Sequence, residues 1–473
     1  MTTAPAFHAH PEGAPEGAAL GWAAHARGLL GLAVPLMLSN LAGFAVGITD
    51  VVLMGRYDVT VLAGMVLAQS LYFIVFLTGS GFAIAVMPLV ATAASQGDER
   101  EVRRVVRMGA WLCAGFAALA LPFLLLAGPL FRAMGQDPEV ATQAGRYLAI
   151  GGWIIVPALL ISLLRSVLSA LERTAVLLWV TVALALANGV LAWALIFGRL
   201  GAPEMGIEGA AWASLAANLG GCAALLAYTL WALPRYRFLQ RLWRPDWAAL
   251  SRVFRLGLPI GGQLLAEVGL FAGSAAMVGW VGAVPLAAHG IALQLASAAF
   301  MLHLGLSQAA TVRAGQALGR GDRRALRGEA GAAVALSVAF ALLTSALFVL
   351  LPEALVGLFV RADDPARPQV LALGTTLLAL AAVFQLFDGA QVLAMGLLRG
   401  LQDTAVPMVL AAVSYWLVGL PIAYALGFWV GWDEVGIWVG LLVGLLAASS
   451  LLMARFWLRA AHPLAAPPLA APL

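Results

Sequence analysis

Three acidic residues stand at positions where a membrane-spanning helix rarely carries charge: Asp50, Glu267 and Asp388. They lie inside long apolar runs, in the segments AGFAVGITDVVLMG, GGQLLAEVGLFAG and AVFQLFDGAQVLAMG. A carboxylate at the centre of a bilayer costs roughly 2.5–3.5 kcal/mol on insertion scales, so it persists where it faces a cavity, a partner or an ion path. These three acids are therefore the first candidates for function.

A buried acid of this kind has two useful states. When ionised it binds a dehydrated cation or a cationic organic molecule, and when protonated it is neutral and stable in a dry cavity. Because burial disfavours the charged form, a proton and a cation compete for the same group. The alternative is a structural acid satisfied by local hydrogen bonds or by an arginine, for which Arg165 is the candidate partner.

The composition determines which elements must hold these acids. Of the 473 residues, 62% are hydrophobic and 11% are charged, and the mean hydropathy is +0.94. A soluble domain is about a quarter charged, so the chain is expected to be an all-α polytopic membrane protein. All 27 basic residues are arginines in short loops rather than in one basic domain, and this distribution argues against a nucleic-acid partner.

Twelve runs are long and apolar enough for membrane-spanning helices, which need about 20 residues each. The expected spans are 28–53, 62–93, 108–133, 143–170, 175–199, 207–233, 252–280, 286–317, 328–351, 369–400, 405–430 and 435–458.

The arginines also predict an orientation. Only six of them fall in the loops after the odd-numbered spans: Arg56, Arg132, Arg146, Arg199, Arg361 and Arg367. Since positive residues stay on the cytoplasmic side, both termini should be cytoplasmic, as an even number of spans requires. We expect a monomer in the lipid of the bacterial inner membrane.

An internal repeat divides the spans into two halves. The segment QGDEREVRR at 96–104 aligns with RGDRRALRG at 320–328, and ERTAV at 172–176 aligns with QDTAV at 402–406. Six helices per copy make the repeat parallel, which is a transporter architecture. The expected parts are a tail (1–27), an N-lobe (28–233), a linker (234–251), a C-lobe (252–458) and a second tail (459–473). The repeat places Ser274, Gly43 and Ala158 opposite the three acids, so none has an acidic twin.

Longer motifs resemble those of the multidrug and toxic compound extrusion transporters, in particular their NorM-type branch. The resemblance covers about residues 28–458. It is carried by ITDVVLMGRYDVTVLAG, GFAIAVMPLVATAASQGD, LPIGGQLLAEVGLFAGSAAMVGWVGAVPLAAHGIALQ and FDGAQVLAMGLLRGLQDTAVPMVLAAVSYWLVGLPIAYALG. It implies two six-helix bundles facing each other in a V and an antiporter that exports amphipathic organic cations in exchange for H⁺ or Na⁺.

The resemblance also implies roles for particular residues. Asp50 and Asn188 match an N-lobe cation or proton site, and Glu267 and Asp388 match the acids of the C-lobe. Either pair offers oxygen ligands to a transient Na⁺, whereas no structural metal or other cofactor is expected. Phe384 stands where the branch has a tyrosine, so the C-lobe lacks that hydroxyl ligand.

Further polar residues accompany the acids. Gln263, Gln385 and Gln391 lie within four residues of Glu267 or Asp388, on shared helix faces, and are candidate cavity-lining residues together with Phe384. For Asn188, helix–helix hydrogen bonding is an equal alternative. His289 and His303 are interpreted as hydrogen-bonded packing residues.

Two other functions remain as alternatives to a multidrug antiporter. A flippase of lipid-linked or polysaccharide precursors would need a strongly cationic cavity, whereas the helices here carry acids. A membrane enzyme is disfavoured because the sequence contains no G-x-S-x-G or H-E-x-x-H motif, and it contains no P-loop that would use ATP.

Overall fold

The computed structural model describes residues 21–462, which fold into helices joined by short turns, with no strand in this range. Twelve helical spans within it are long and apolar enough to cross a membrane, so the predicted fold class is confirmed. The elements are α1 (Trp22–Tyr57), α2 (Val59–Ser95), α3 (Glu99–Leu125), α4 (Ala127–Ala133), α5 (Pro138–Gly151), η1 (Gly152–Ile154), α6 (Ile155–Ala170), α7 (Ala175–Phe197), α8 (Gly206–Ala232), η2 (Pro234–Tyr236), α9 (Trp247–Val281), α10 (Ala283–Arg320), α11 (Arg323–Leu350), α12 (Pro352–Gly357), α13 (Arg367–Gly400), α14 (Ala405–Ala412), η3 (Val413–Gly419), α15 (Leu420–Tyr424), η4 (Ala425–Trp429) and α16 (Asp433–Ala461).

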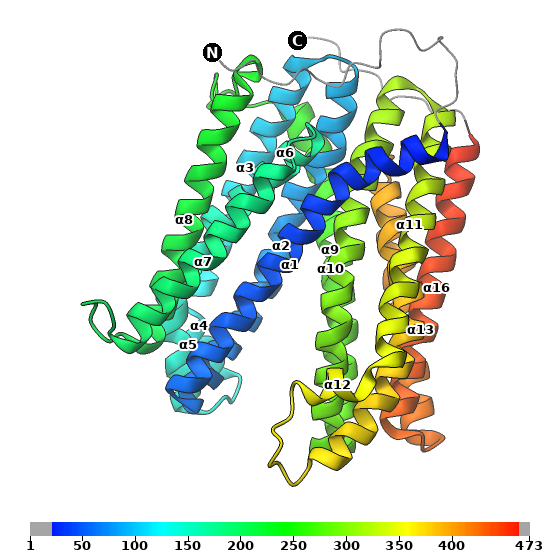
Figure 1. The fold of residues 1–473 in the computed structure, drawn as a ribbon. Helices are drawn as coiled ribbons and strands as arrows, with labels where there is room; N and C mark the ends of the chain where they lie inside the picture. The colour runs from blue at the N-terminus through cyan, green and yellow to red at the C-terminus, as the bar shows by residue number, and fades with distance from the viewer. Residues whose placement is uncertain (1–20, 463–473) are drawn as a thin grey trace.

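The helices form two bundles, α1–α8 (the N-lobe) and α9–α16 (the C-lobe), which meet at the top of Figure 1 and lean apart toward the bottom. α1 begins and α16 ends at the top, which we call the terminal end, and the opposite end is the far end. α1 slants across the molecule and contacts α10 and α11 of the C-lobe as well as α7 of its own lobe.

The repeat seen in the sequence is also present in the backbone. Gly97 and Gly321 have positive φ angles of 72° and 67°, in the left-handed region where glycine carries no side-chain penalty. The next residue in each copy, Asp98 or Asp322, caps the following helix by accepting a hydrogen bond from a backbone N–H three residues on. The matching segments of the two halves therefore encode the same turn and the same helix start.

These aspartate caps explain why several helices begin earlier than the sequence predicts. α3 begins at Glu99, not near 108, because its capped first turn carries charge and extends beyond the apolar run. α9 begins at Trp247, not at 252, because the Asp246 cap starts the helix before Arg252. Asp246 is the cap of α9 and accepts a hydrogen bond from the Ala249 N–H. The linker predicted to run to residue 251 therefore ends at Asp246.

The N-terminal tail is also shorter than predicted within the described residues. α1 begins at Trp22, and the imidazole Nδ1 of the buried His25 lies 3.1 Å from Glu329 Oε1 of α11. The sequence prediction missed this segment because a contact with the other lobe, rather than a continuous apolar run, accompanies it. Residues 1–20 and 463–473 of the predicted tails lie outside the described residues.

Polar contacts between the lobes gather at the terminal end. The Thr92 hydroxyl donates to the carbonyl of Gly315 at 3.1 Å, and Gln402 Nε2 donates to Thr92 Oγ1 at 3.3 Å. On the other side, Glu172 Oε1 accepts from Gln316 Nε2 at 2.9 Å and lies 3.4 Å from Arg313 Nη1.

These contacts between the lobes follow the internal repeat. Glu172 and Gln402 occupy equivalent turns with positive φ angles of 59° and 58°, and each reaches a helix of the opposite lobe. At the terminal end the two lobes are therefore joined by a pair of reciprocal contacts, in addition to the packing of α1 and α2 against helices of the C-lobe.

Candidate functional site: an acidic cluster in each lobe

The N-lobe cluster is built around Asp50 of α1. Asn188 of α7 donates a hydrogen bond from Nδ2 to Asp50 Oδ1 at 2.7 Å, and both side chains are buried. The structure thus brings together the two residues that the resemblance pairs, and the bond ties α1 to α7. The Asn188 Oδ1 atom has no hydrogen-bond partner among the described residues, so the amide can accept from or bind a further ligand.

Two more side chains of this cluster were not found from the sequence. Ser214 of α8 lies close enough to interact with Asp50 and with Tyr147, a buried residue of α5. Four helices therefore contribute to the surroundings of one carboxylate. No spacing rule links these residues, because each contact crosses from one helix to another.

Arg165 is not the partner of Asp50. Its guanidinium donates to Ser39 Oγ at 2.9 Å, to Thr181 Oγ1 at 3.3 Å and to Asn40 Oδ1 at 2.9 Å. Asn40 precedes Asp50 by ten residues on α1, which is about 15 Å along a helix axis. The Asp50 carboxylate therefore keeps an amide partner and no paired arginine.

The C-lobe cluster contains a chain of three polar side chains. Gln263 Nε2 donates to Glu267 Oε2 at 3.3 Å on α9, and Arg399 of α13 donates to the Gln263 Oε1 atom. The positive charge of Arg399 also acts on Glu267 directly. Arg399 stands one residue before the end of α13, and its long side chain reaches inward from there, which the sequence prediction did not anticipate.

Asp388 lies beside Glu267 and is 2% exposed, and its Oδ1 atom has no hydrogen-bond partner among the described residues. The Tyr415 hydroxyl and the Gln391 amide interact with each other and with Glu267, yet neither makes a hydrogen bond of good geometry. Buried polar groups are normally satisfied. This cluster thus has unused capacity to hold a proton or a cation.

Tyr415 supplies a hydroxyl that the sequence prediction missed. Phe384, at the position expected to lack this group, packs away from the acids, with its ring centroid 6.2 Å from that of Phe271 and 5.8 Å from that of Trp438. Tyr415 enters instead from η3, a π-helical segment in the eleventh span, and π-helical turns are frequent at functional sites. An intramembrane tyrosine in VSYWLVG was the only signal in the sequence.

The candidate lining residues separate into two groups. Gln263 and Gln391 lie at the acids, whereas Phe384 and Gln385 do not, because that turn of α13 packs directly against its neighbours. Gln385 Nε2 donates to the backbone carbonyl of Ala296 on α10 at 3.2 Å, and Gln385 therefore joins two helices.

The two membrane histidines are packing residues, as predicted. His289 Nδ1 accepts a hydrogen bond from Trp438 Nε1 at 3.0 Å, and His303 Nδ1 lies 3.2 Å from Ser337 Oγ. Both contacts are buried, and the His303 ring packs against Gly389, the residue that follows Asp388.

Comparison with known proteins places the clusters in context. A family model described as MatE matches residues 35–194 and 259–425. A Rhizobium meliloti protein named probable multidrug resistance protein NorM is 45% identical over 438 residues, which cover 92% of this chain and 94% of that protein. A Pseudomonas putida protein of the same name is 38% identical over 434 residues, covering 91% of this chain and 94% of that one.

Solved structures with the same fold are more distant in sequence. A eukaryotic MATE transporter superposes with a TM-score of 0.81 at 19% identity, covering 93% of this chain and 97% of that one. A structure described as the outward-facing conformation of a multidrug resistance MATE family transporter gives a TM-score of 0.81 at 19% identity, covering 92% and 96%.

Proposed function

This chain belongs to the MatE family of multidrug efflux transporters, and we propose that it is a secondary active antiporter that exports amphipathic organic cations in exchange for H⁺ or Na⁺. It would act as a monomer in the bacterial inner membrane, with both ends of the chain in the cytoplasm and no cofactor other than the coupling ion.

One observation carries this proposal: within the described residues, each of the two acidic clusters contains one carboxylate inside a membrane span that forms no ion pair. In the N-lobe the Asp50 carboxylate is bonded to the neutral Asn188 amide. In the C-lobe the positive charge of Arg399 acts on Glu267, and Asp388 has no positive partner of its own among the described residues. An uncompensated carboxylate in a dry lobe attracts either a proton or a cation. Competition between the two is the chemical basis of exchange.

The interlobe contacts support a direction for the exchange. Because they lie at the terminal end, and the arginine distribution predicts that this end is cytoplasmic, the closed side faces the cytoplasm and the lobes lean apart toward the outside (Figure 1). In this state an external H⁺ or Na⁺ reaches the acids and displaces the organic cation. Opening of the reciprocal contacts then exposes the ion-loaded acids to the cytoplasm, where the ion leaves and a new organic cation binds.

The ligands around Asp388 suit either coupling ion. A Na⁺ ion needs several oxygen ligands, and the Tyr415 hydroxyl with the Glu267 and Asp388 carboxylates would provide them despite the phenylalanine at 384. A proton needs only one carboxylate, which either lobe provides. Both ions are therefore retained in the proposal.

A flippase of lipid-linked precursors fits the buried charges less well. A pyrophosphate group would seek unpaired arginines, whereas Arg165 is bonded to three side chains and Arg399 faces Glu267. Within residues 21–462, Asp50 and Asp388 form no ion pair, and such a carboxylate in each lobe favours a cationic substrate.

Transport by inside-out vesicles tests the proposal. Ethidium or a fluoroquinolone is followed after imposing first a pH gradient and then a Na⁺ gradient of matched size. Movement driven by one gradient and abolished by the matching ionophore is expected. If neither gradient drives movement, the proposal is wrong.

Substitutions of the acids then test which of them transport requires. Asp50→Asn and Asp388→Asn should each lower gradient-driven transport at least tenfold, because an amide neither takes up a proton nor pairs with a cation. Asp363→Asn is the matched control, since Asp363 is an exposed acid in the loop before α13. Full activity in the Asp50→Asn, Asp388→Asn double variant would refute the roles given to these residues.

A further inference from the structure

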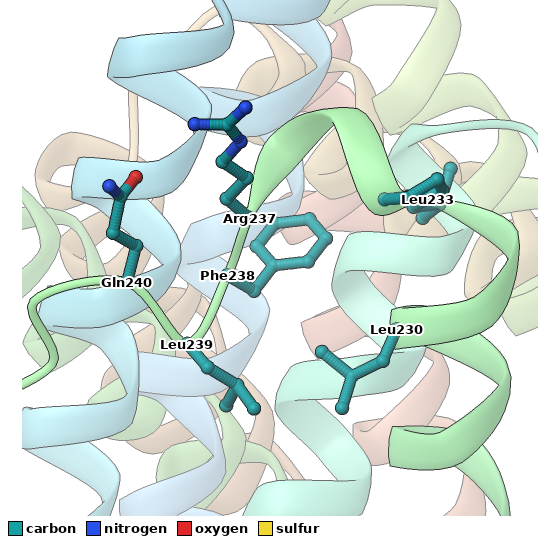
Figure 2. Close-up of a pocket in the computed structure, with 7 residues that line it drawn as sticks. Leu230, Leu233, Arg237, Phe238, Leu239 and Gln240 are labelled. Atoms are coloured by element: carbon teal, nitrogen blue, oxygen red, sulfur yellow. The ribbon is translucent and has the colours of Figure 1, made fainter.

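A groove at the terminal end lies where the two lobes are joined by the linker, away from both acidic clusters. Its volume is about 290 Å³. It is lined by Leu230, Leu233, Pro234, Arg237, Phe238, Leu239 and Gln240, and we call it the linker groove (Figure 2).

The groove forms because the chain reverses direction after α8. Pro234 opens the short helix η2, and Arg237 follows with a positive φ of 48°, which turns residues 238–240 back beside the last turn of α8. The buried Phe238 ring stacks on Tyr236 at 5.4 Å between centroids and forms the floor. The turn thus creates an apolar slot from residues that are adjacent in the sequence.

The groove is polar at one end and apolar at the other. In Figure 2 the Arg237 guanidinium and the Gln240 amide lie near the top, while Leu230 and Leu239 lie at the bottom. α8 runs toward the terminal end, so Leu230 lies one turn deeper in the membrane than Leu233. A ligand that fits must carry its charge at the surface and its apolar part toward the bilayer interior.

Positive charge surrounds the polar end. The linker and the starts of α3 and α9 carry ten arginines (Arg100, Arg103, Arg104, Arg107, Arg235, Arg237, Arg241, Arg244, Arg252 and Arg255) and four acids (Asp98, Glu99, Glu101 and Asp246). Glu101 and Asp246 already pair with arginines of α3 and α9. Within the described residues no carboxylate forms an ion pair with Arg237, which is exposed.

Exposed tryptophans place the groove at the depth of the lipid headgroups. Trp231, Trp243 and Trp247 flank it and are 79%, 77% and 70% exposed. Tryptophan is enriched at the boundary between membrane and water, where its ring lies among headgroups. The polar end of the groove is therefore at the level of lipid phosphates, and its apolar end is at the level of the first acyl carbons.

We propose that the linker groove binds one anionic phospholipid of the adjoining leaflet, with the phosphate against Arg237 and an acyl chain against Leu230 and Leu239. The surplus of arginines favours an anionic headgroup over a zwitterionic one and repels the cationic substrates of the transporter. Free phosphate would leave the apolar walls uncovered. The volume is near the lower limit of ligand sites, about 300 Å³, so the groove holds part of a lipid, and the remainder stays in the bilayer.

Native mass spectrometry of the purified full chain in detergent tests this site. Dioleoylphosphatidylglycerol and dioleoylphosphatidylcholine are titrated separately, because they share acyl chains and differ in net charge. We expect one phosphatidylglycerol molecule to bind roughly fivefold or more tightly than phosphatidylcholine, since one basic residue near an anionic lipid contributes about that factor. Equal retention of the two lipids would overturn the proposal, as would complete displacement of phosphatidylglycerol by millimolar inorganic phosphate.

Variants locate the site. Arg237→Gln should weaken phosphatidylglycerol binding about fivefold, whereas Arg237→Lys, which keeps the charge, should retain most of it. Leu239→Ser should weaken both lipids, because it removes an apolar wall. Arg132→Gln and Leu358→Ser are matched controls at exposed positions of the far end.

These residues are exposed, so the variants should fold, and thermal unfolding of each sample verifies it. If Arg237→Gln binds phosphatidylglycerol as tightly as Arg132→Gln does, the arginine is not a lipid ligand and the proposed site is wrong.

Discussion

Replacing Arg399 by glutamine should destabilise the C-lobe through Glu267. Arg399 and Glu267 are buried and linked by Gln263, with no direct nitrogen–oxygen contact within 4 Å. Two unit charges at 4 Å interact by about 4 kcal/mol at an effective dielectric constant of 20, and this sets an upper bound. Removing one partner of a buried pair costs about 3–5 kcal/mol because the other charge stays uncompensated. We expect a loss of about 3 kcal/mol for Arg399→Gln.

A double-mutant cycle separates charge from packing. If the loss comes from an uncompensated carboxylate, Glu267→Gln added to Arg399→Gln should recover about 2 kcal/mol of it. The free energy of unfolding is measured in detergent by titration with sodium dodecyl sulfate, followed by the fluorescence of the 15 tryptophans. Additive losses, with a coupling energy below about 0.5 kcal/mol, would refute the reasoning.

The exposed pair Arg361–Asp363 is the control for this cycle. Its side chains are 83% and 71% exposed, and Arg361 Nη2 lies 3.0 Å from Asp363 Oδ2. A solvent-exposed pair contributes about 0–1 kcal/mol, so Arg361→Gln should change the stability little in the same assay.

Three further predictions concern contacts between the two lobes. The Arg104 guanidinium holds the pKa of the Asp246 carboxyl below its ordinary value, so the stability from this pair is complete above about pH 4 and is lost as the pH falls below it. Asp246→Asn keeps a capping oxygen without the charge and should flatten the dependence of the unfolding midpoint on pH between 5 and 3; an unchanged slope would contradict this. Glu172→Gln removes the ion pair with Arg313 and should raise the fraction of molecules with separated terminal ends two- to fivefold in spin-label distance measurements; an unaltered distance distribution would exclude this role. Gly81→Ala places a methyl group against the backbone of α9 at the lobe interface and should cost about 1–3 kcal/mol of stability, a result refuted if the variant unfolds like the wild type.

The candidate site was only partly predictable from the sequence. Asp50 and Asp388 were found because an acidic residue inside an apolar run can be recognised from its sequence neighbours alone. Arg399 was missed because it lies near a helix end, where an arginine usually turns toward the headgroups, and Tyr415 was missed because its orientation depends on a π-helical turn. Phe384 lacks the hydroxyl at its own position, and the sequence alone did not indicate that Tyr415 brings a tyrosine hydroxyl to the acids from another helix.

The sequence alone determined the number of spans, the parallel repeat and the depth of the acids, because hydropathy and local motifs are properties of consecutive residues. The matched turns before Asp98 and Asp322 are likewise determined by consecutive residues. The tertiary structure decided which side chains share a cluster and at which end the lobes meet. Those features depend on how each helix is rotated and where it crosses its neighbours, and the packing of many distant residues sets both.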